Sequence, residues 1–216
     1  NTAISQEGLK GGWGAEMGRT LLKLHGDHLP TRLRAAAAAG SDARMNGCEL
    51  PVVIVSGSGN QGMTASLPVI EYAKVIGADH EALLRALAVS DLITIHQKTG
   101  IGRLSAFCGA TSAGCGAACG IAYLDGAKPE MIAKTIVNTL GICSGMVCDG
   151  AKSSCAAKIA AAVEAGLDGY EMAKVDLGFV NGEGIIGADV EQTIVNVGRM
   201  ARQGMQHTDE EILNIM

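Results

Sequence analysis

Aromatic residues and positive charge are both scarce in this chain. The 216 residues include only two Phe, three Tyr and one Trp, and the net charge at pH 7 is −5. Proteins that bind nucleic acids need clustered Lys and Arg for the phosphates, and single-strand binders add aromatic side chains that stack on bases. The composition therefore argues against nucleic acid as a partner.

The chain also lacks a segment suited to a lipid bilayer. Residues 104–124 carry no charged side chain and are long enough to span one. However, this segment holds four glycines, three cysteines and three hydroxyl residues, with few large apolar side chains. We expect a helix buried inside a globular protein, with no membrane contact. No signal peptide is recognisable, so the expected location is the cytoplasm.

The cysteines do not follow the pattern of a disulfide scaffold. There are seven, an odd number, and all except Cys48 lie within residues 108–155. Secreted disulfide-rich domains are shorter and carry an even number of cysteines spread along the chain. We expect reduced thiols. Cys115 and Cys119 share one helical stripe with Cys108 and are interpreted as buried packing residues.

Glycine and alanine are abundant, and helical signals dominate. The chain contains 30 glycines but shows neither a repeated strand–helix pattern nor sustained alternation of polar and apolar residues. We predict an all-α, or nearly all-α, fold. Residues 1–216 would form one domain, a compact bundle of small-residue-rich helices with glycine-rich loops. Only the apolar run at residues 51–55 could form a strand.

Local signals predict where several helices begin and end. The predicted features are a helix over residues 31–39 ended by Gly40, a helix over residues 105–124, a helix from Pro129 to Ile142, a helix over residues 152–165 ended by Gly166, caps at Asp79 and Asp189, and a capping box of Thr208 with Glu211.

Three cysteines are candidate metal ligands. Cys148 and Cys155 bracket a polar turn between two predicted helices, and Cys108 lies in the first turn of the helix predicted over residues 105–124. Thiolates without a neighbouring histidine suit an iron–sulfur cluster or a zinc ion. A [4Fe–4S] cluster held by three thiolates leaves one iron free to act as a Lewis acid. The Cys-x6-Cys spacing is not specific by itself, so a metal-free turn is the alternative.

A glycine-rich loop over residues 56–62 is the second candidate site. Its polar side chains, Ser56, Ser58, Asn60 and Gln61, alternate with glycines ahead of a predicted helix. Exposed backbone N–H groups in such a loop can bind an anion. The alternative is a plain glycine turn. The loop is neither a P-loop nor a dinucleotide fingerprint, because no Lys-Ser/Thr pair ends it and no βαβ unit surrounds it.

A few charged residues could assist these sites. Lys152 lies between the two late cysteines and could pair with a carboxylate or simply be solvated. His96, Lys98 and Arg103 form a weaker set. His96 could act as a base, although such a histidine is more often a helix-end residue.

Four segments occur in a characteristic order: residues 42–45, 56–62, 102–108 and 145–152. Together they resemble the L-cysteine desulfidase family, which is related to the α chain of iron–sulfur L-serine dehydratase, and the resemblance covers nearly the whole chain. The steps of 40 residues from Cys108 to Cys148 and of 7 residues to Cys155 match the family's cluster cysteines.

The resemblance implies β-elimination from L-cysteine or L-serine, with pyruvate and ammonia as products. Cys108, Cys148 and Cys155 would hold a [4Fe–4S] cluster whose free iron binds the leaving thiol or hydroxyl. The polar residues of the glycine-rich loop would hold the carboxylate or amine of the substrate, with help from Lys152.

Family members are about twice as long as this chain. The resemblance therefore implies a C-terminal half, with the catalytic base and a further cysteine in an N-terminal half that would be its main partner. The half alone can then lack both cluster and activity. Extensive contacts with other domains, or with copies in a homo-oligomer, are also expected. Two other classes stay open: a zinc-binding structural domain, and a small-molecule-binding module that uses only the glycine-rich loop.

Overall fold

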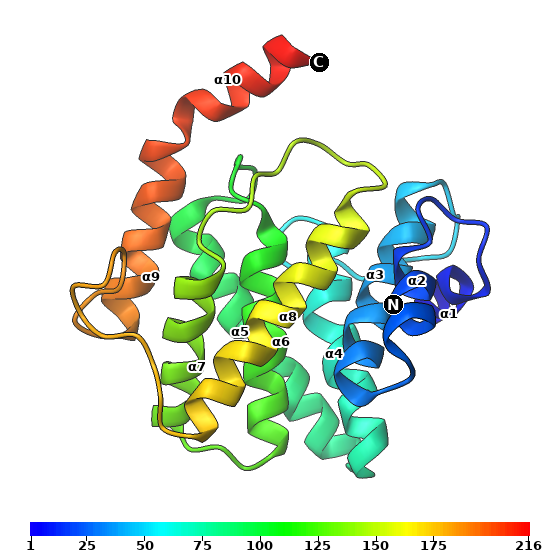
Figure 1. Ribbon diagram of the computed structural model, residues 1–216, viewed down its shortest axis with the longest axis horizontal. Coiled ribbons are helices and arrows are strands. Elements are labelled where there is room, and N and C mark those ends of the chain that lie inside the picture. Colours follow the sequence, from blue (N-terminus) through cyan, green and yellow to red (C-terminus); the bar gives the residue numbers. More distant parts are fainter.

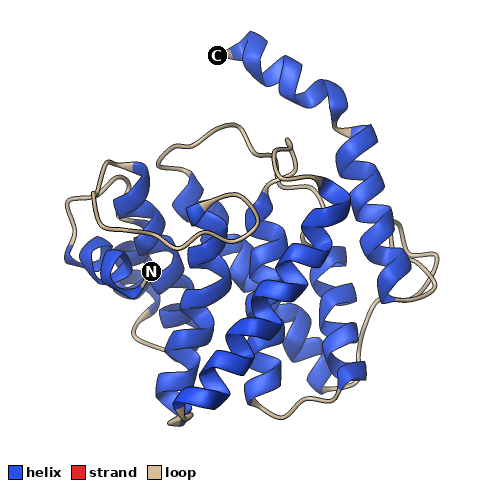
Figure 2. Cartoon of the chain, turned by 180° about the vertical axis from the view of Figure 1, so that it is seen from behind, coloured by secondary structure: helices blue, strands red, loops and turns tan.

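The computed structural model describes all of residues 1–216 as helices joined by loops (Figures 1 and 2). It has ten α-helices, one π-helical turn and no β-strand, which confirms the predicted all-α class. No helix combines the length and apolar character needed to cross a bilayer. The elements are α1 (Thr2–Lys10), α2 (Met17–His25), α3 (Leu29–Met45), α4 (Gly59–Ile76), α5 (His80–Ile101), α6 (Gly109–Leu124), α7 (Pro129–Ile142), α8 (Cys155–Lys174), α9 (Val190–Arg199), η1 (Met200–Gly204) and α10 (Gln206–Ile215).

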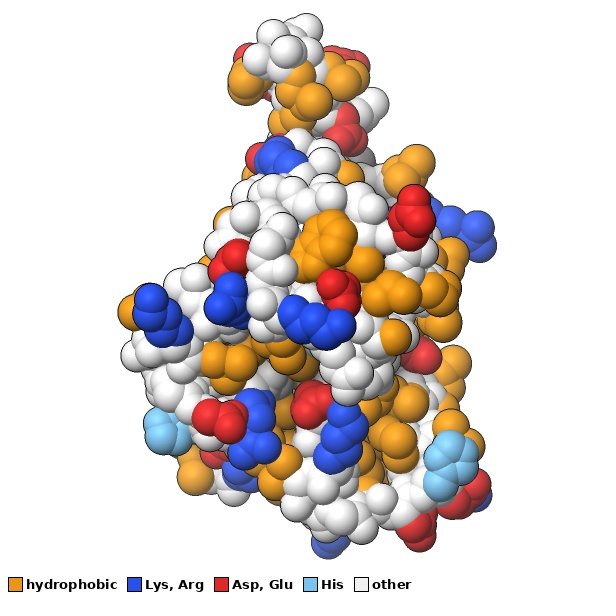
Figure 3. Space-filling model, turned by 90° about the vertical axis from the view of Figure 1, so that its right-hand side faces the viewer, with side chains coloured by type: hydrophobic (Ala, Val, Ile, Leu, Met, Phe, Trp, Pro, Cys, Tyr) orange, Lys and Arg blue, Asp and Glu red, His pale blue; other side chains and the backbone are white.

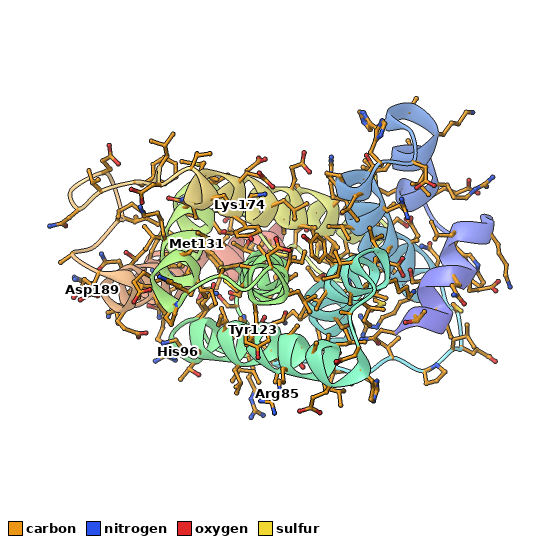
Figure 4. All side chains as sticks on the ribbon, turned by 90° about the horizontal axis from the view of Figure 1, so that it is seen from below. Arg85, His96, Tyr123, Met131, Lys174 and Asp189 are labelled. Atoms are coloured by element: carbon orange, nitrogen blue, oxygen red, sulfur yellow. The ribbon has the colours of Figure 1, made fainter.

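Helix α6 lies at the centre of the bundle. Thirteen of its sixteen residues are buried, and α4, α5, α7 and α8 surround it (Figure 4). Its glycines allow close approach of the neighbouring backbones. A Cβ at Gly114 would lie 2.3 Å from the Ala162 carbonyl oxygen on α8, and one at Gly116 would lie 2.4 Å from that of Ser90 on α5. Most of the uncharged segment therefore forms the core of the bundle, as predicted.

The predicted caps at Asp79 and Asp189 are confirmed. Each Oδ1 accepts a hydrogen bond from the backbone N–H three residues later, at 2.7 Å from Ala82 and 2.8 Å from Gln192. Helix α7 also has the predicted bounds, Pro129–Ile142. These signals are reliable because both partners of a cap lie within one helical turn.

Two glycines that were predicted to end helices lie inside them. Helix α3 continues past Gly40 to Met45, and α8 continues past Gly166 to Lys174. A Cβ at Gly40 would lie 2.7 Å from the sulfur of Met63, and one at Gly166 would lie 2.5 Å from the carbonyl oxygen of Gly114. The lack of a side chain is needed there for helix packing, not for a left-handed turn.

Two further local predictions are wrong. Helix α10 begins without a side-chain cap, so Thr208 and Glu211 form no capping box. Residues 51–55 form no strand, because the only pairing there joins Val55 to Ser58 across a tight turn. An isolated apolar run cannot become a strand without a partner segment.

Candidate functional site

A cavity opens where α4, α6 and α8 begin, at the upper end of the bundle in Figure 1. Its volume is about 270 Å³. Sites for drug-sized ligands are typically about 300–1,000 Å³, so this cavity suits a smaller molecule. Cys108, Cys148 and Cys155 all line it. The fold thus brings the three predicted metal ligands to one cavity from separate parts of the chain.

A short main-chain pairing places Cys108 beside Cys148. Residues 106–108 pair antiparallel with residues 146–148, through N–H···O bonds of 2.9 and 2.6 Å that the two cysteine amides donate. Because side chains alternate along an extended segment, the two cysteines lie on the same face of this pairing. Their proximity is therefore fixed by the backbone.

The two thiols interact, and this separates their pKa values. The Cys108 thiol lowers the pKa of Cys148 to about 6, and the Gly150 amide and the Lys158 ammonium act in the same direction, against burial. The Cys148 thiol, together with burial, raises the pKa of Cys108. The pair can therefore lose one proton near neutral pH and form a thiolate, which is the form that binds metals.

Cys155 lines the same cavity but stands apart from this pair. It is the first residue of α8, and its thiol donates to the Gly150 carbonyl oxygen at 3.6 Å. No group of three or more His, Cys, Asp or Glu side chains has the spacing of a metal site in this structure. Ligation by all three cysteines stays a prediction. It would require Cys155 to leave Gly150, because a thiolate has no proton to donate.

Three of the four predicted residues of the glycine-rich loop line the cavity. Ser58 caps α4 by accepting from the Gln61 N–H at 3.1 Å, and Asn60 accepts from Arg44 at 3.1 Å. Gln61 is buried, and its Oε1 has no hydrogen-bond partner. Ser56 instead lines a neighbouring pocket. The loop therefore contributes a buried acceptor without a partner beside the cavity.

The cavity is rich in positive charge. Four cationic side chains line it and no carboxylate does; the cations are Arg44, Lys98, Arg103 and Lys158. The first turns of α4, α6 and α8 add the positive ends of their helix dipoles. This arrangement suits an anion, either a thiolate-bound cluster or the carboxylate of a small ligand.

Lys152 and His96 do not line this cavity. Lys152 is exposed and pairs with Asp149 at 2.7 Å. Lys152 and Lys158 together hold the pKa of Asp149 well below its usual range. His96 projects from the outer face of α5, and its Nε2 lies 2.8 Å from the Glu191 carboxylate of α9 (Figure 4). Two other lysines line the cavity: Lys98 of α5, and Lys158, which lies one helical turn after Cys155.

Comparison with known proteins identifies the family. The family described as serine dehydratase alpha chain matches residues 1–214. The chain belongs to this serine dehydratase family. It is 60% identical over its whole length to the UPF0597 protein DSY1109 of Desulfitobacterium hafniense (strain Y51), and 56% identical to a UPF0597 protein of Lachnoclostridium phytofermentans. It is 44% identical to the UPF0597 protein YhaM of Salmonella newport.

The chain spans about half the length of the curated relatives that it matches. It covers 50% of the Desulfitobacterium protein, 52% of the Lachnoclostridium protein and 51% of the Salmonella protein. No solved structure matches the chain significantly.

Proposed function

We propose that this serine dehydratase family member acts in an iron–sulfur-dependent lyase reaction, the β-elimination of a small L-amino acid. L-Cysteine would give pyruvate, ammonia and sulfide, and L-serine would give pyruvate and ammonia. The observation that carries the proposal is the cavity at which three thiols, four cations and three helix N-termini meet without a carboxylate. The reaction would take place in the cytoplasm, where thiols stay reduced.

The side chains that line the cavity fit a [4Fe–4S] cluster held by Cys108, Cys148 and Cys155. Thiolates are the usual ligands of such clusters, and a cationic cavity offsets their negative charge. No fourth Cys, and no His, Asp or Glu, lines the cavity, whereas a structural zinc site fills four positions with protein ligands. When bound, the cluster would supply an open iron as a Lewis acid for the departing thiol or hydroxyl.

The residues of the chain would bind and orient the amino acid. The free Oε1 of Gln61 can accept a hydrogen bond from the substrate ammonium, which would satisfy a buried acceptor that now lacks a partner. Ser58 and Asn60 hold the start of α4 in place through their bonds to Gln61 and Arg44. The base that removes the α-proton would come from the remainder of a longer protein, as the half-length match to relatives suggests.

Anaerobic reconstitution with iron and sulfide tests the cluster directly. The protein would be expressed at the full length of its gene, as the parent and as Cys148→Ser and Cys143→Ser variants. Cys143 is a matched control because it is half-buried but does not line the cavity. We expect the parent and Cys143→Ser to show the broad visible absorbance of an iron–sulfur cluster and to form pyruvate. Cys148→Ser should lose both.

Metal analysis separates the proposal from its main rival. One zinc ion per chain, without sulfide, would favour a zinc-binding structural domain and would contradict the lyase. A Cys148→Ser variant with the same visible spectrum as the parent would also contradict it. Retention of serine or cysteine binding after loss of all three cysteines would instead favour a metal-independent binding module.

A further inference from the structure

Lys98 is a buried cation without a partner. Its side chain comes from the last turns of α5, is only 3% exposed and lines the cavity. Its ammonium makes no ion pair with any carboxylate. Burial lowers the pKa of Lys98, and only Cys108 and Cys148, in their thiolate forms, would act against this. A lysine is almost never buried unless it is paired, so an anionic partner is missing.

The other cations of the cavity differ from Lys98. Lys158 pairs with Asp149 and donates to the Val147 carbonyl oxygen at 2.8 Å. Arg44 donates to Asn60 at 3.1 Å. Arg103 is exposed to solvent. An ion pair with an exposed side chain contributes little free energy, because water screens the charges. Lys98 therefore has the largest unmet demand for negative charge.

We propose that Lys98 binds the carboxylate of the amino-acid substrate and so selects for a free acid over its amide. This inference rests on the proposed function, because it names which side chain holds the substrate of that reaction. A carboxylate that pairs with Lys98 lies near the thiols of Cys108 and Cys148. The amino acid is small enough for its β-substituent to face them. Hydrogen bonds between charged groups are stronger than neutral ones, and a buried setting strengthens them further.

A pair of alkylating reagents tests this without any enzyme activity. Iodoacetate carries a carboxylate, whereas iodoacetamide has nearly the same shape without charge, and both lose iodide to a thiolate. The rate of modification of Cys148 would be measured by mass spectrometry in the metal-free protein, for the parent and for Lys98→Gln, Lys98→Arg and Lys134→Gln. Lys134 is a matched control, since it pairs with Asp176 away from the cavity.

We expect the iodoacetate-to-iodoacetamide rate ratio to fall about tenfold in Lys98→Gln. The ratio should be retained in Lys98→Arg and Lys134→Gln. An equal slowing of both reagents in Lys98→Gln would mean that Lys98 only favours the thiolate, and it would overturn the inference. An unchanged ratio would overturn it too.

A measurement on the parent protein covers the case in which Lys98→Gln fails to fold. Acetate should protect Cys148 from iodoacetamide, and acetamide at the same concentration should not. Equal protection by both, or by neither, would contradict a carboxylate site. Absence of lyase activity with the rate ratio intact would refute the proposed function alone, because the anion site would then exist without the reaction.

Discussion

A buried carboxylate, Asp42, and a half-buried one, Asp91, differ in their hydrogen bonds. Asp42 is fully buried in α3, and its Oδ2 accepts from the Gly18 N–H at 3.0 Å, at the start of α2. Asp91 lies on α5, and its buried Oδ1 has no partner. Burial raises the pKa of both carboxyl groups. Asp42 accepts one hydrogen bond that joins α2 to α3, whereas Asp91 accepts none from the protein.

Replacing Asp91 should therefore stabilise the protein at neutral pH. An Asp91→Asn variant keeps the size of the side chain and removes a charge that burial disfavours. We expect the free energy of unfolding at pH 7 to rise by about 1 kcal/mol, or about 2–4 °C in Tm. Thermal unfolding followed by circular dichroism measures this. Asp168→Asn is the control, because Asp168 is an exposed carboxylate on α8.

The same variant should show a characteristic pH dependence. The pKa of Asp91 is higher in the folded protein than in the unfolded chain, so stability is lost as pH rises through that range. The advantage of Asp91→Asn should shrink as pH falls through the raised pKa and disappear below about 3, where the carboxyl group is protonated in both states. An advantage that does not change between pH 4 and pH 7 would contradict this account.

Single residues also mark the limit of what the sequence could predict at the site. The sequence predicted the three cysteines and three loop residues that line the cavity. It placed Lys98 only in a weaker set of charged residues that could assist the sites, and Lys98 lines the cavity. Thr94, Lys98 and Ile101 continue the buried face of α5 at helical spacing. A lysine in a helix is normally expected to extend its side chain into solvent. Only the packing of the neighbouring helices shows that the side chain of Lys98 is enclosed.

Close contact between α6 and α8 depends on glycine. The Cβ of a Gly166→Ala variant would lie 2.5 Å from the carbonyl oxygen of Gly114, which belongs to a helix backbone and cannot swing aside. We expect a loss of about 2–3 kcal/mol in the free energy of unfolding, as overpacked cores show. Urea unfolding measures it.

Gly100→Ala is the matched control for this prediction. Gly100 is also inside a helix, but a Cβ there would meet only the Gly198 Cα, at an ordinary 3.5 Å. The main effect of Gly100→Ala should then be a lower conformational entropy of the unfolded chain. We expect the free energy of unfolding to rise by about 0.5–1 kcal/mol. Equal effects of the two substitutions would mean that helix propensity, and not helix packing, determines the outcome at Gly166.

Helix ends differ in how far the sequence determines them. The aspartate caps of α5 and α9 were predictable because each involves only neighbours along the chain. Gly40 and Gly166 were misinterpreted as helix ends because the sequence cannot show what lies opposite a glycine. The atoms they avoid belong to Met63 and Gly114, which are distant in sequence.

Helix α10 stands away from the rest of the molecule (Figures 1 and 3). None of its residues is buried, and it packs mainly against η1. Its exposed side chains include Leu213 and Ile215. At the scale of the whole molecule, the bundle and its cavity are therefore complete without this helix.

Deletion of residues 206–216 should leave the fold nearly unchanged. We expect Tm to change by less than about 2 °C, because no buried apolar surface is removed. Deletion of residues 190–216 is the contrasting variant, since it also removes the buried Ile194 and Val197 of α9. That variant should lose several kcal/mol of stability. A large loss from the shorter deletion would show that α10 contributes to the core.

The main-chain pairing of residues 106–108 with residues 146–148 affects how the chain would receive a metal. In many small metalloproteins the polypeptide is disordered until the ion arrives, and ordering the chain then weakens the apparent affinity. Here the folding of α6 and α7 brings residues 106–108 and 146–148 together. The conformational entropy of closing the chain between them is therefore lost during folding, before any metal binds. If the chain binds a metal as proposed, two of the three thiols would meet the incoming ion already in place, and a chelator should then remove the metal without unfolding the bundle.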